Sequence, residues 1–231
     1  AYVQDKGTLV VGITEFEPMD YQNTDGEWIG FDADLAKEFA ESLGVTVEFQ
    51  LIDWDNKVME LDGKTIDVVW NGMTLTEDVL AAMECSQPYL INQQVVVVPA
   101  DVAEDYQTEE SLADLNFAVE IGSAGCEVAQ ANGYSYTEVA DQATALLEVA
   151  SGTADAAIID SLMAGAMIGE GTSYADMTST VALTSEEYGV GFRKGSDLAA
   201  TLNEFLSGKY ADGSIQTLAE TYGVQDALVQ E

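Results

Sequence analysis

The 231-residue chain contains no histidine and only seven lysines and arginines, against 42 aspartates and glutamates, which gives a formal net charge of −35. The absence of histidine excludes Ser-His-Asp and Cys-His catalysis as well as zinc sites with histidine ligands. Seven scattered cations cannot form the basic patch through which a protein binds nucleic acid or docks on an anionic membrane. We therefore expect no nucleic-acid partner.

Cysteine and long apolar segments are also scarce. Cys85 and Cys126 are the only cysteines, too few for a disulfide framework, so one disulfide and two free thiols are both open. No run of 18 apolar residues is present, and we expect no segment that spans a bilayer. The start at Ala1-Tyr2-Val3 shows no signal-peptide pattern and is compatible with a mature exported protein.

Hydrophobic residues make up 47% of the chain, which indicates a folded globular protein. The length suits one large domain or two small ones. Short apolar runs alternate with stretches of helical period, which favours an α/β fold with mainly parallel sheets flanked by helices. A polar stretch over 99–111 interrupts this alternation, and its restart indicates a second lobe. Strands are expected at 8–13, 45–52, 66–70, 94–98, 116–121, 154–159 and 188–192. Helices are expected at 31–43, 56–61, 76–83, 126–131, 141–150, 197–206 and 215–222, with Thr76 as a candidate N-cap.

Five stretches resemble the amino-acid-binding proteins of ABC importers, the extracellular solute-binding family 3. They are LVVGIT with PMDY (9–14 and 18–21), GFDADLA (30–36), the segment from DWD to NGMTLT (53–76), SQPY (86–89) and GVGFRKG (189–195). Each motif alone is weak, but their order and spacing together cover nearly the whole chain.

The resemblance implies a two-lobed fold of the type II periplasmic-binding-protein kind. Lobe one would comprise 1–97 and 188–231, and lobe two 98–187, joined by two crossing strands. A small polar or cationic amino acid would lie in a cleft between the lobes, which close by a hinge motion. The implied protein is a monomer outside the cytoplasm, periplasmic or a surface lipoprotein, that delivers its ligand to ABC permease subunits and needs no cofactor.

In lobe one the resemblance assigns ligand contacts to five residues. Phe16 and Trp54 take the positions of aromatic residues that stack on the ligand. The alternative is that both are core residues. Asn71, Gly72 and Thr74 follow the strand that ends at Trp70, where backbone groups and a hydroxyl can meet a zwitterion. The alternative for these three is an ordinary turn between a strand and a helix.

In lobe two the resemblance assigns four further contacts. Ser123 and Ala124 lie in a small-residue turn before a helix, where free N–H groups suit a carboxylate. Asp160 would pair with the ligand's α-ammonium, or else cap the helix that starts at Ser161. Glu120 would face the ligand side chain, or else point outward from an edge strand. A buried Glu120 would favour a cationic ligand.

One departure from the family pattern concerns the ligand's carboxylate. The family usually places an arginine where this chain has Val79, and Arg193 is the only arginine present. A bidentate arginine is the strongest single carboxylate contact. Either Thr74, the turn at Ser123 and Lys57 hold the carboxylate, or the ligand is not a standard α-amino acid.

Three classes of function remain open. A binding protein fits all these features and is our prediction, so we expect no enzyme and no catalytic residue. A dehydratase-like enzyme on the same fold would use Glu120 or Asp160 as a general acid or base. A sensor domain of a longer receptor is the third. We expect no metal site, because no calcium-loop motif of the form D-x-[DN]-x-[DN]-G is present.

Overall fold

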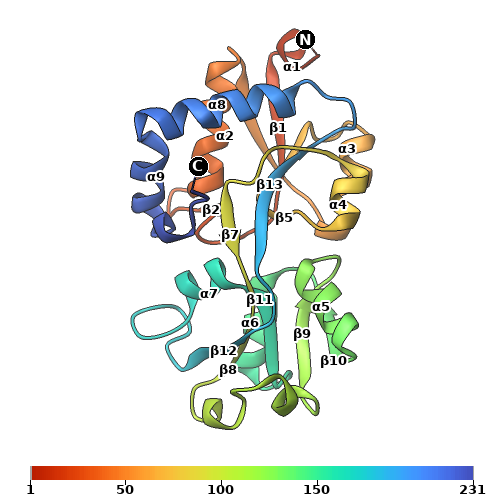
Figure 1. The fold of residues 1–231 in the computed structure, drawn as a ribbon, viewed down its shortest axis with the longest axis vertical. Helices are drawn as coiled ribbons and strands as arrows, with labels where there is room; N and C mark the ends of the chain where they lie inside the picture. Colours follow the sequence, from red (N-terminus) through yellow and green to blue (C-terminus); the bar gives the residue numbers. More distant parts are fainter. Residues whose placement is uncertain (1, 231) are drawn as a thin grey trace. The chain divides into compact units, whose positions relative to one another are not determined.

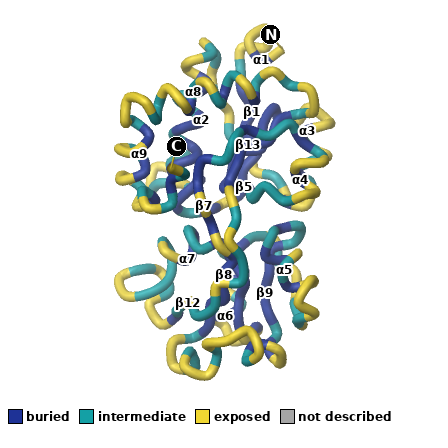
Figure 2. The backbone as a smooth tube through the Cα atoms, in the orientation of Figure 1, coloured by how far each residue is buried: buried dark blue, intermediate teal, exposed yellow. Residues whose placement is uncertain are grey.

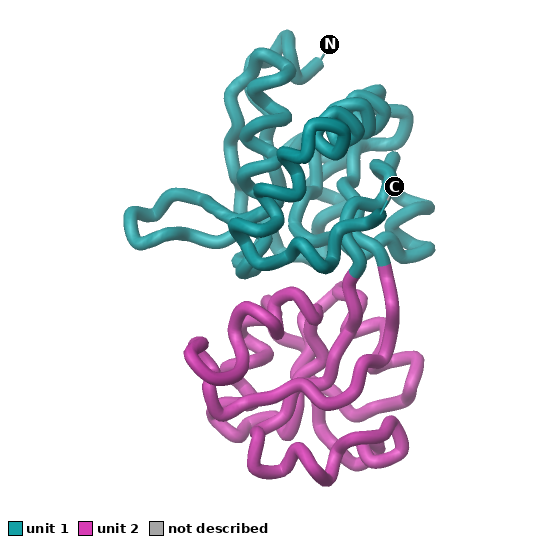
Figure 3. Tube along the Cα trace, turned by 60° about the vertical axis from the view of Figure 1, so that its left-hand side comes forward, with its two compact units in different colours: residues 1–91, 187–231 teal, residues 92–186 magenta. Residues whose placement is uncertain are grey.

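The computed structural model describes residues 2–230, which form two α/β units (Figure 1). Unit 1 comprises residues 1–91 and 187–231, and unit 2 comprises residues 92–186 (Figure 3). Ala1 and Glu231, the outer ends of the two segments expected for lobe one, lie outside the described residues.

Unit 1 is built on a mixed six-stranded sheet. Its order is β4-β1-β5-β13-β6, with β7 also paired to β13, and β1 runs parallel to β4 and β5 while β13 is antiparallel to β5 and β6. The bounds are β1 Thr8–Ile13, β4 Thr46–Leu51, β5 Val68–Thr74, β6 Glu84–Cys85, β7 Leu90–Asn92 and β13 Glu186–Phe192. A separate hairpin joins β2 (Tyr21–Gln22) to β3 (Trp28–Ile29).

The helices of unit 1 follow the predicted apolar faces. In α2 (Phe31–Ser42) the apolar residues of one face are buried, and the helix ends before Gly44, which has a φ of +71° as a left-handed stop requires. The Thr76 hydroxyl accepts a hydrogen bond from the Val79 N–H at 3.2 Å, which confirms the N-cap of α4 (Glu77–Ala82). The other helical segments are α1 Tyr2–Lys6, η1 Trp54–Asn56, α3 Lys57–Asp62, α8 Leu198–Asp212, α9 Ser214–Tyr222 and η4 Gln225–Ala227.

Unit 2 is built on a mixed five-stranded sheet of order β10-β9-β11-β8-β12. Strand β9 is parallel to β10 and β11, whereas β8 is antiparallel to β11 and β12. The strands are β8 Gln94–Pro99, β9 Asn116–Glu120, β10 Ser135–Val139, β11 Ala156–Asp160 and β12 Met177–Ala182. The helical segments are η2 Ala103–Asp105, η3 Glu109–Leu112, α5 Ala124–Asn132, α6 Gln142–Ser151 and α7 Ser161–Met167.

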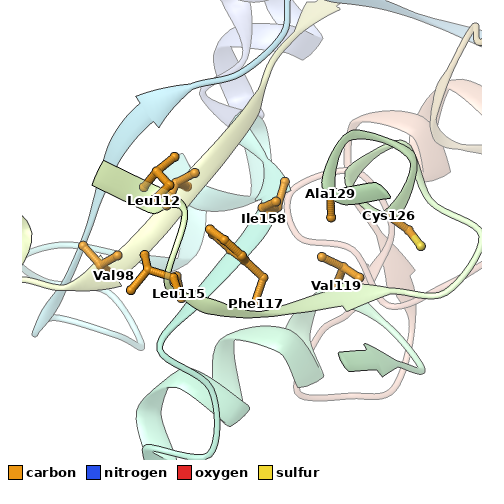
Figure 4. Close-up of a cluster of buried hydrophobic side chains, with 10 residues drawn as sticks. Val98, Leu112, Leu115, Phe117, Val119, Cys126, Ala129 and Ile158 are labelled. Atoms are coloured by element: carbon orange, nitrogen blue, oxygen red, sulfur yellow. The ribbon is translucent and has the colours of Figure 1, made fainter. Parts of the chain in front are cut away.

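A compact apolar cluster fills one side of the unit 2 sheet (Figure 4). Its members come from β8, β9, β11, α5 and the segment before β9. Phe117 lies at its centre with no exposed surface and stacks on Tyr134 at a centroid distance of 5.0 Å. The central strands of both sheets are buried along most of their length, while the outer loops are exposed (Figure 2). The carboxyl ends of these central strands are therefore fixed by a packed core.

The structure differs from the sequence-based elements in several ways. Strand β5 continues through Thr74, so residues 71–74 lie in a strand and not in a turn. Strand β8 pairs only within unit 2, and the first crossing therefore falls at residue 92, where the sequence suggested 98. The sheets are mixed, not mainly parallel. The edge strands β10 and β12 are exposed or half-buried along most of their length and so lack an alternating apolar pattern, and the sequence did not reveal them.

Candidate functional site

Phe16 and Gly72 form a close contact in unit 1. Phe16 is 3% exposed and meets Tyr188 edge to face, with ring centroids 6.4 Å apart. Gly72 has a φ of +55°, and a Cβ at this position would lie 2.6 Å from Cε1 of Phe16 and 3.0 Å from Cε2 of Tyr188. Only glycine allows the two rings to approach the backbone of β5 this closely.

The N–H of Gly72 is bound within the protein. It donates to Oδ2 of Asp32 at 2.6 Å, and the Tyr89 hydroxyl lies 2.8 Å from both Asp32 oxygens. Burial raises the pKa of Asp32 to about 7, and the hydrogen bonds from Gly72 and Tyr89 moderate the rise. This N–H is therefore used within unit 1, and a ligand contact by Gly72 stays a prediction. Asp32 belongs to the GFDADLA motif, which was the available signal for its role.

Asn71 likewise serves the protein interior. Its Oδ1 accepts the Thr14 N–H at 3.0 Å, and its Nδ2 donates to Oγ1 of Thr14 at 2.7 Å. This pair ties β5 to the segment that follows β1. Thr74 is the last residue of β5, is partly exposed and lies opposite Tyr188 in the antiparallel register.

Trp54 and Val79 belong to one buried cluster of unit 1. Trp54 is 7% exposed, and Nζ of Lys57 lies 4.7 Å from the centroid of its ring, a cation–π distance. Val79 is 6% exposed in the same cluster, so an apolar side chain fills the position of the family arginine. The guanidinium of Arg193 does not replace it, since it donates to Leu61 O, Ile66 O and Asp67.

Ser123 caps α5 in unit 2. Its hydroxyl accepts the Cys126 N–H at 3.1 Å, and Ala124 is the first residue of the helix. The N–H groups of the first turn point out of the helix at its positive end, an arrangement that attracts a carboxylate. The small-residue turn predicted from the sequence thus has the geometry of a helix start.

Asp160 is the last residue of β11 and is 4% exposed. The amides of Asn92 and Gln94 donate to its Oδ1, and the amide of Gln142 donates to its Oδ2. Gln142 also accepts the Asp160 N–H at 2.9 Å. Asp160 occupies the N-cap position of α7, but its side chain makes no capping bond, so the alternative role as a side-chain cap is wrong.

Glu120 is the last residue of β9, and Oε2 lies 3.5 Å from the Gln142 amide nitrogen. Because β9 lies between β10 and β11 and Glu120 is 4% exposed, the alternative of an outward-pointing residue on an edge strand is wrong. The parallel strands β9 and β11 end at the same edge of the sheet. This edge therefore carries both Glu120 and Asp160.

Glu186 and three amides complete this cluster and were missed from the sequence. The amides of Asn92 and Gln94 lie 2.8 and 2.7 Å from Oε1 of Glu186. Residues 92–186 contain no lysine, arginine or histidine. Neutral amides donate to Asp160, and the Thr184 hydroxyl also donates to Oε2 of Glu186, at 3.0 Å. These asparagine and glutamine residues belong to no recognised motif. Only the strand register, and for Gln142 the placement of α6, brings them to the carboxylates.

One other question left open by the sequence has an answer. Cys85 and Cys126 are both free thiols. Over residues 2–230, no set of three or more acidic or cysteine side chains has an arrangement able to hold a metal ion. Within the same span, every helix is too short or too polar to cross a bilayer.

Residues 9–225 match the model of the bacterial extracellular solute-binding proteins, family 3, and the chain belongs to this family. It is similar to the L-cystine-binding protein TcyJ of Escherichia coli (strain K12), with 29% identity over 95% of this chain and 84% of TcyJ. It also resembles a mutant of ArgBP from T. maritima, with a TM-score of 0.88, 33% identity and 96% and 97% of the two chains covered. A histidine-bound ABC uptake transporter substrate-binding protein from Streptococcus pneumoniae gives a TM-score of 0.89, 28% identity and coverages of 99% and 97%.

An enzyme is also among the relatives. The cyclohexadienyl dehydratase of Pseudomonas aeruginosa is 24% identical over 70% of this chain and 62% of the enzyme. This match is shorter and weaker than those to the binding proteins. The relatives with higher identity are binding proteins and not enzymes.

Proposed function

We propose that this chain is the extracytoplasmic substrate-binding protein of an ABC importer for amino acids, acting as a monomer and passing its ligand to the permease subunits. The observation that carries the proposal is the environment of Asp160. Its carboxylate is buried at a strand end and is oriented by three amide groups. Amides hold a carboxylate without neutralising it, which suits the binding of an ammonium group.

The proposed roles of the other unit 2 residues follow from their chemistry. Asp160 binds the α-ammonium, and the helix start at Ser123 and Ala124 binds the α-carboxylate together with Thr74 of unit 1. Glu120 binds a cationic or hydrogen-bonding group on the ligand side chain. Because Val79 is part of the core, the N–H groups at a helix N-terminus and a threonine hydroxyl make the carboxylate contact that an arginine makes in the family.

In unit 1, Phe16 and Trp54 supply aromatic surface to the ligand. Asn71 and Gly72 act by shape, because the Asn71 amide binds Thr14 and the Gly72 N–H binds Asp32. A cationic amino acid is the preferred ligand class, since Glu120 and the two aromatic rings all attract positive charge.

A thermal-shift screen tests the proposal. The purified chain is heated with each standard amino acid, ornithine, citrulline and quaternary amines, because a ligand of the folded state raises Tm by mass action. We expect an increase with one class of amino acid, and loss of that increase in Asp160→Asn but not in Asp114→Asn, an exposed control in the same unit. An increase with a non-amino-acid amine alone would contradict the proposal.

The dehydratase-like alternative has its own readout. A binding protein returns its ligand unchanged, whereas an enzyme converts it. The amino acid that raises Tm is incubated with the chain and followed by NMR. An unchanged spectrum supports the receptor, and loss of water from the bound compound would favour the enzyme.

A further inference from the structure

We infer that Gln94 and Gln142 are positioning residues that fix the direction of the Asp160 carboxylate and thereby give the site its selectivity for an α-ammonium group. The inference rests on the proposed function, in which Asp160 binds that group. Neither glutamine touches the ligand in this scheme. Each acts through Asp160, from a different element and on a different oxygen.

Gln142 binds Asp160 with both ends of its amide. Its Oε1 accepts the Asp160 N–H at 2.9 Å, and its Nε2 donates to Oδ2 of the same residue. The side chain is 7% exposed and starts at the first residue of α6, where the Asp141 cap accepts the Thr144 N–H at 2.7 Å. One side chain therefore links the backbone and the carboxylate of Asp160, which restricts the rotation of that carboxylate.

Gln94 holds the opposite oxygen. It is the direct partner of Asp160 in the antiparallel pairing of β8 with β11, and its Nε2 donates to Oδ1 at 2.7 Å. Gly125 makes room for it, because a Cβ there would lie 2.9 Å from Oε1 of Gln94 and 2.9 Å from Ile158 O. A glycine in the first turn of α5 is thus a condition for this placement of the amide.

Each amide nitrogen also reaches a second carboxylate. The nitrogen of Gln142 lies 3.5 Å from Oε2 of Glu120, and that of Gln94 lies 2.7 Å from Oε1 of Glu186. The two amides therefore set the spacing of three carboxylates, those of Glu120, Asp160 and Glu186. Networks of this kind stabilise a single arrangement of their members more than isolated pairs do.

The chemical consequence concerns direction and not charge. Oδ1 accepts amide bonds from Asn92 and Gln94, and Oδ2 accepts one from Gln142, so the carboxylate is held through both oxygens in one orientation. In that orientation it meets the α-ammonium group of the proposed ligand. Removal of one glutamine amide leaves the carboxylate charged but less firmly oriented, since only two of its three amide donors remain. General attraction for a cation then persists, while the preference for a correctly placed α-ammonium falls.

The test compares Gln142→Met and Gln94→Met with the wild-type chain and with Gln130→Met, an exposed glutamine of the same unit. The probes, measured by calorimetry, are L-arginine and 5-guanidinopentanoate, which lacks the α-ammonium, and L-glutamine and glutaramate as a neutral pair. We expect both variants to weaken amino-acid binding about tenfold or more, as loss of orienting partners does at metal sites. Binding of the analogues should stay within about twofold, and Gln130→Met should behave as wild type.

Unchanged amino-acid affinity in both variants, or an equal loss for the amino acid and its analogue, would overturn the inference. If Asp160→Asn weakens binding in the same series, the proposed function stands while the inference fails. If neither of these two amino acids binds the wild-type chain, the comparison is made with the amino acid that raises Tm and its analogue without the α-ammonium. If no amino acid binds the wild-type chain, the proposed function fails and the inference with it. Circular dichroism shows whether each variant is folded. Because the two glutamines lie on separate elements, one folded variant is sufficient to test the inference.

Discussion

The N–H of Gly72 donates to Oδ2 of Asp32 at 2.6 Å, across 40 residues of sequence. This bond joins the middle of β5 to the first turn of α2, and the Tyr89 hydroxyl meets the same carboxylate from the segment before β7. The first aspartate of the GFDADLA motif is therefore a structural residue of unit 1. The ring of Phe16 lies against the other side of Gly72.

Gly72→Ala should destabilise the protein for two reasons. The φ of +55° costs an L-residue about 1–2 kcal/mol, and the added methyl, 2.6 Å from Phe16, costs about a further 1–3 kcal/mol by overpacking. Gly26→Ala is the matched control, since Gly26 also has a positive φ but no atom lies within 4 Å of its Cβ. Urea unfolding measures both, and equal losses of stability would contradict the packing explanation.

Asp20 and Asp32 should each contribute to the free energy of unfolding at low pH. This contribution should fall as the pH rises from about 4 toward 7. Burial and the neighbouring Asp32 raise the pKa of Asp20 well above its usual value, and burial raises that of Asp32 to about 7. The folded state thus holds protons that the unfolded chain, with aspartate pKa values of about 3.9, releases first. Stability from this source is present at low pH and lost with increasing pH.

Asp20→Asn should therefore raise stability at pH 8 relative to wild type by more than at pH 4.5. Neither Asp20 oxygen has a hydrogen-bond partner within residues 2–230, so the neutral amide removes the energetic penalty of a buried charge. The exposed Asp62→Asn should leave the pH profile unchanged. Denaturant unfolding across this pH range is the measurement. A difference between Asp20→Asn and wild type that does not vary with pH would exclude this role for Asp20.

Glu120→Gln should weaken the binding of a cationic amino acid more than that of a neutral one. Glu120 is buried at the end of β9, and the substitution removes its charge while it keeps the shape. Loss of a charge-assisted hydrogen bond costs about 1.5–3 kcal/mol, or roughly ten- to a hundredfold in affinity. Calorimetry with L-arginine and L-glutamine measures the difference, with the exposed Glu104→Gln as control. Equal losses for both ligands would remove Glu120 from the basis of selectivity.

Salt should stabilise the fold, because 42 acidic residues face only seven cationic ones. The excess acidic side chains repel one another. Raising the salt concentration from 0.1 to 1 M shortens the screening length from about 10 Å to about 3 Å and weakens this electrostatic repulsion. We expect Tm to rise equally in NaCl and KCl, and Asp101→Lys, a change at an exposed site, to reduce the rise. A rise in only one of the two salts would indicate a specific ion in place of screening.

The sequence by itself determined the elements that carry strong local patterns. The buried face of α2, the cap at Thr76 and the strand that ends at Asp160 were all visible, because apolar spacing and capping residues act over a few positions. The ordered motifs also sufficed to recognise the family. The acidic composition and the lack of histidine excluded whole classes of chemistry without any structure.

Only the tertiary structure decided which groups meet. The amides of Gln94 and Gln142 become partners of Asp160 through the pairing of β8 with β11 and the placement of α6, which no local pattern encodes. The same holds for the hydrogen bond from the Gly72 N–H to Asp32, which no local pattern encodes either. Hydrogen-bond partners depend on register between segments tens of residues apart, whereas helix and strand formation depends on neighbours along the chain.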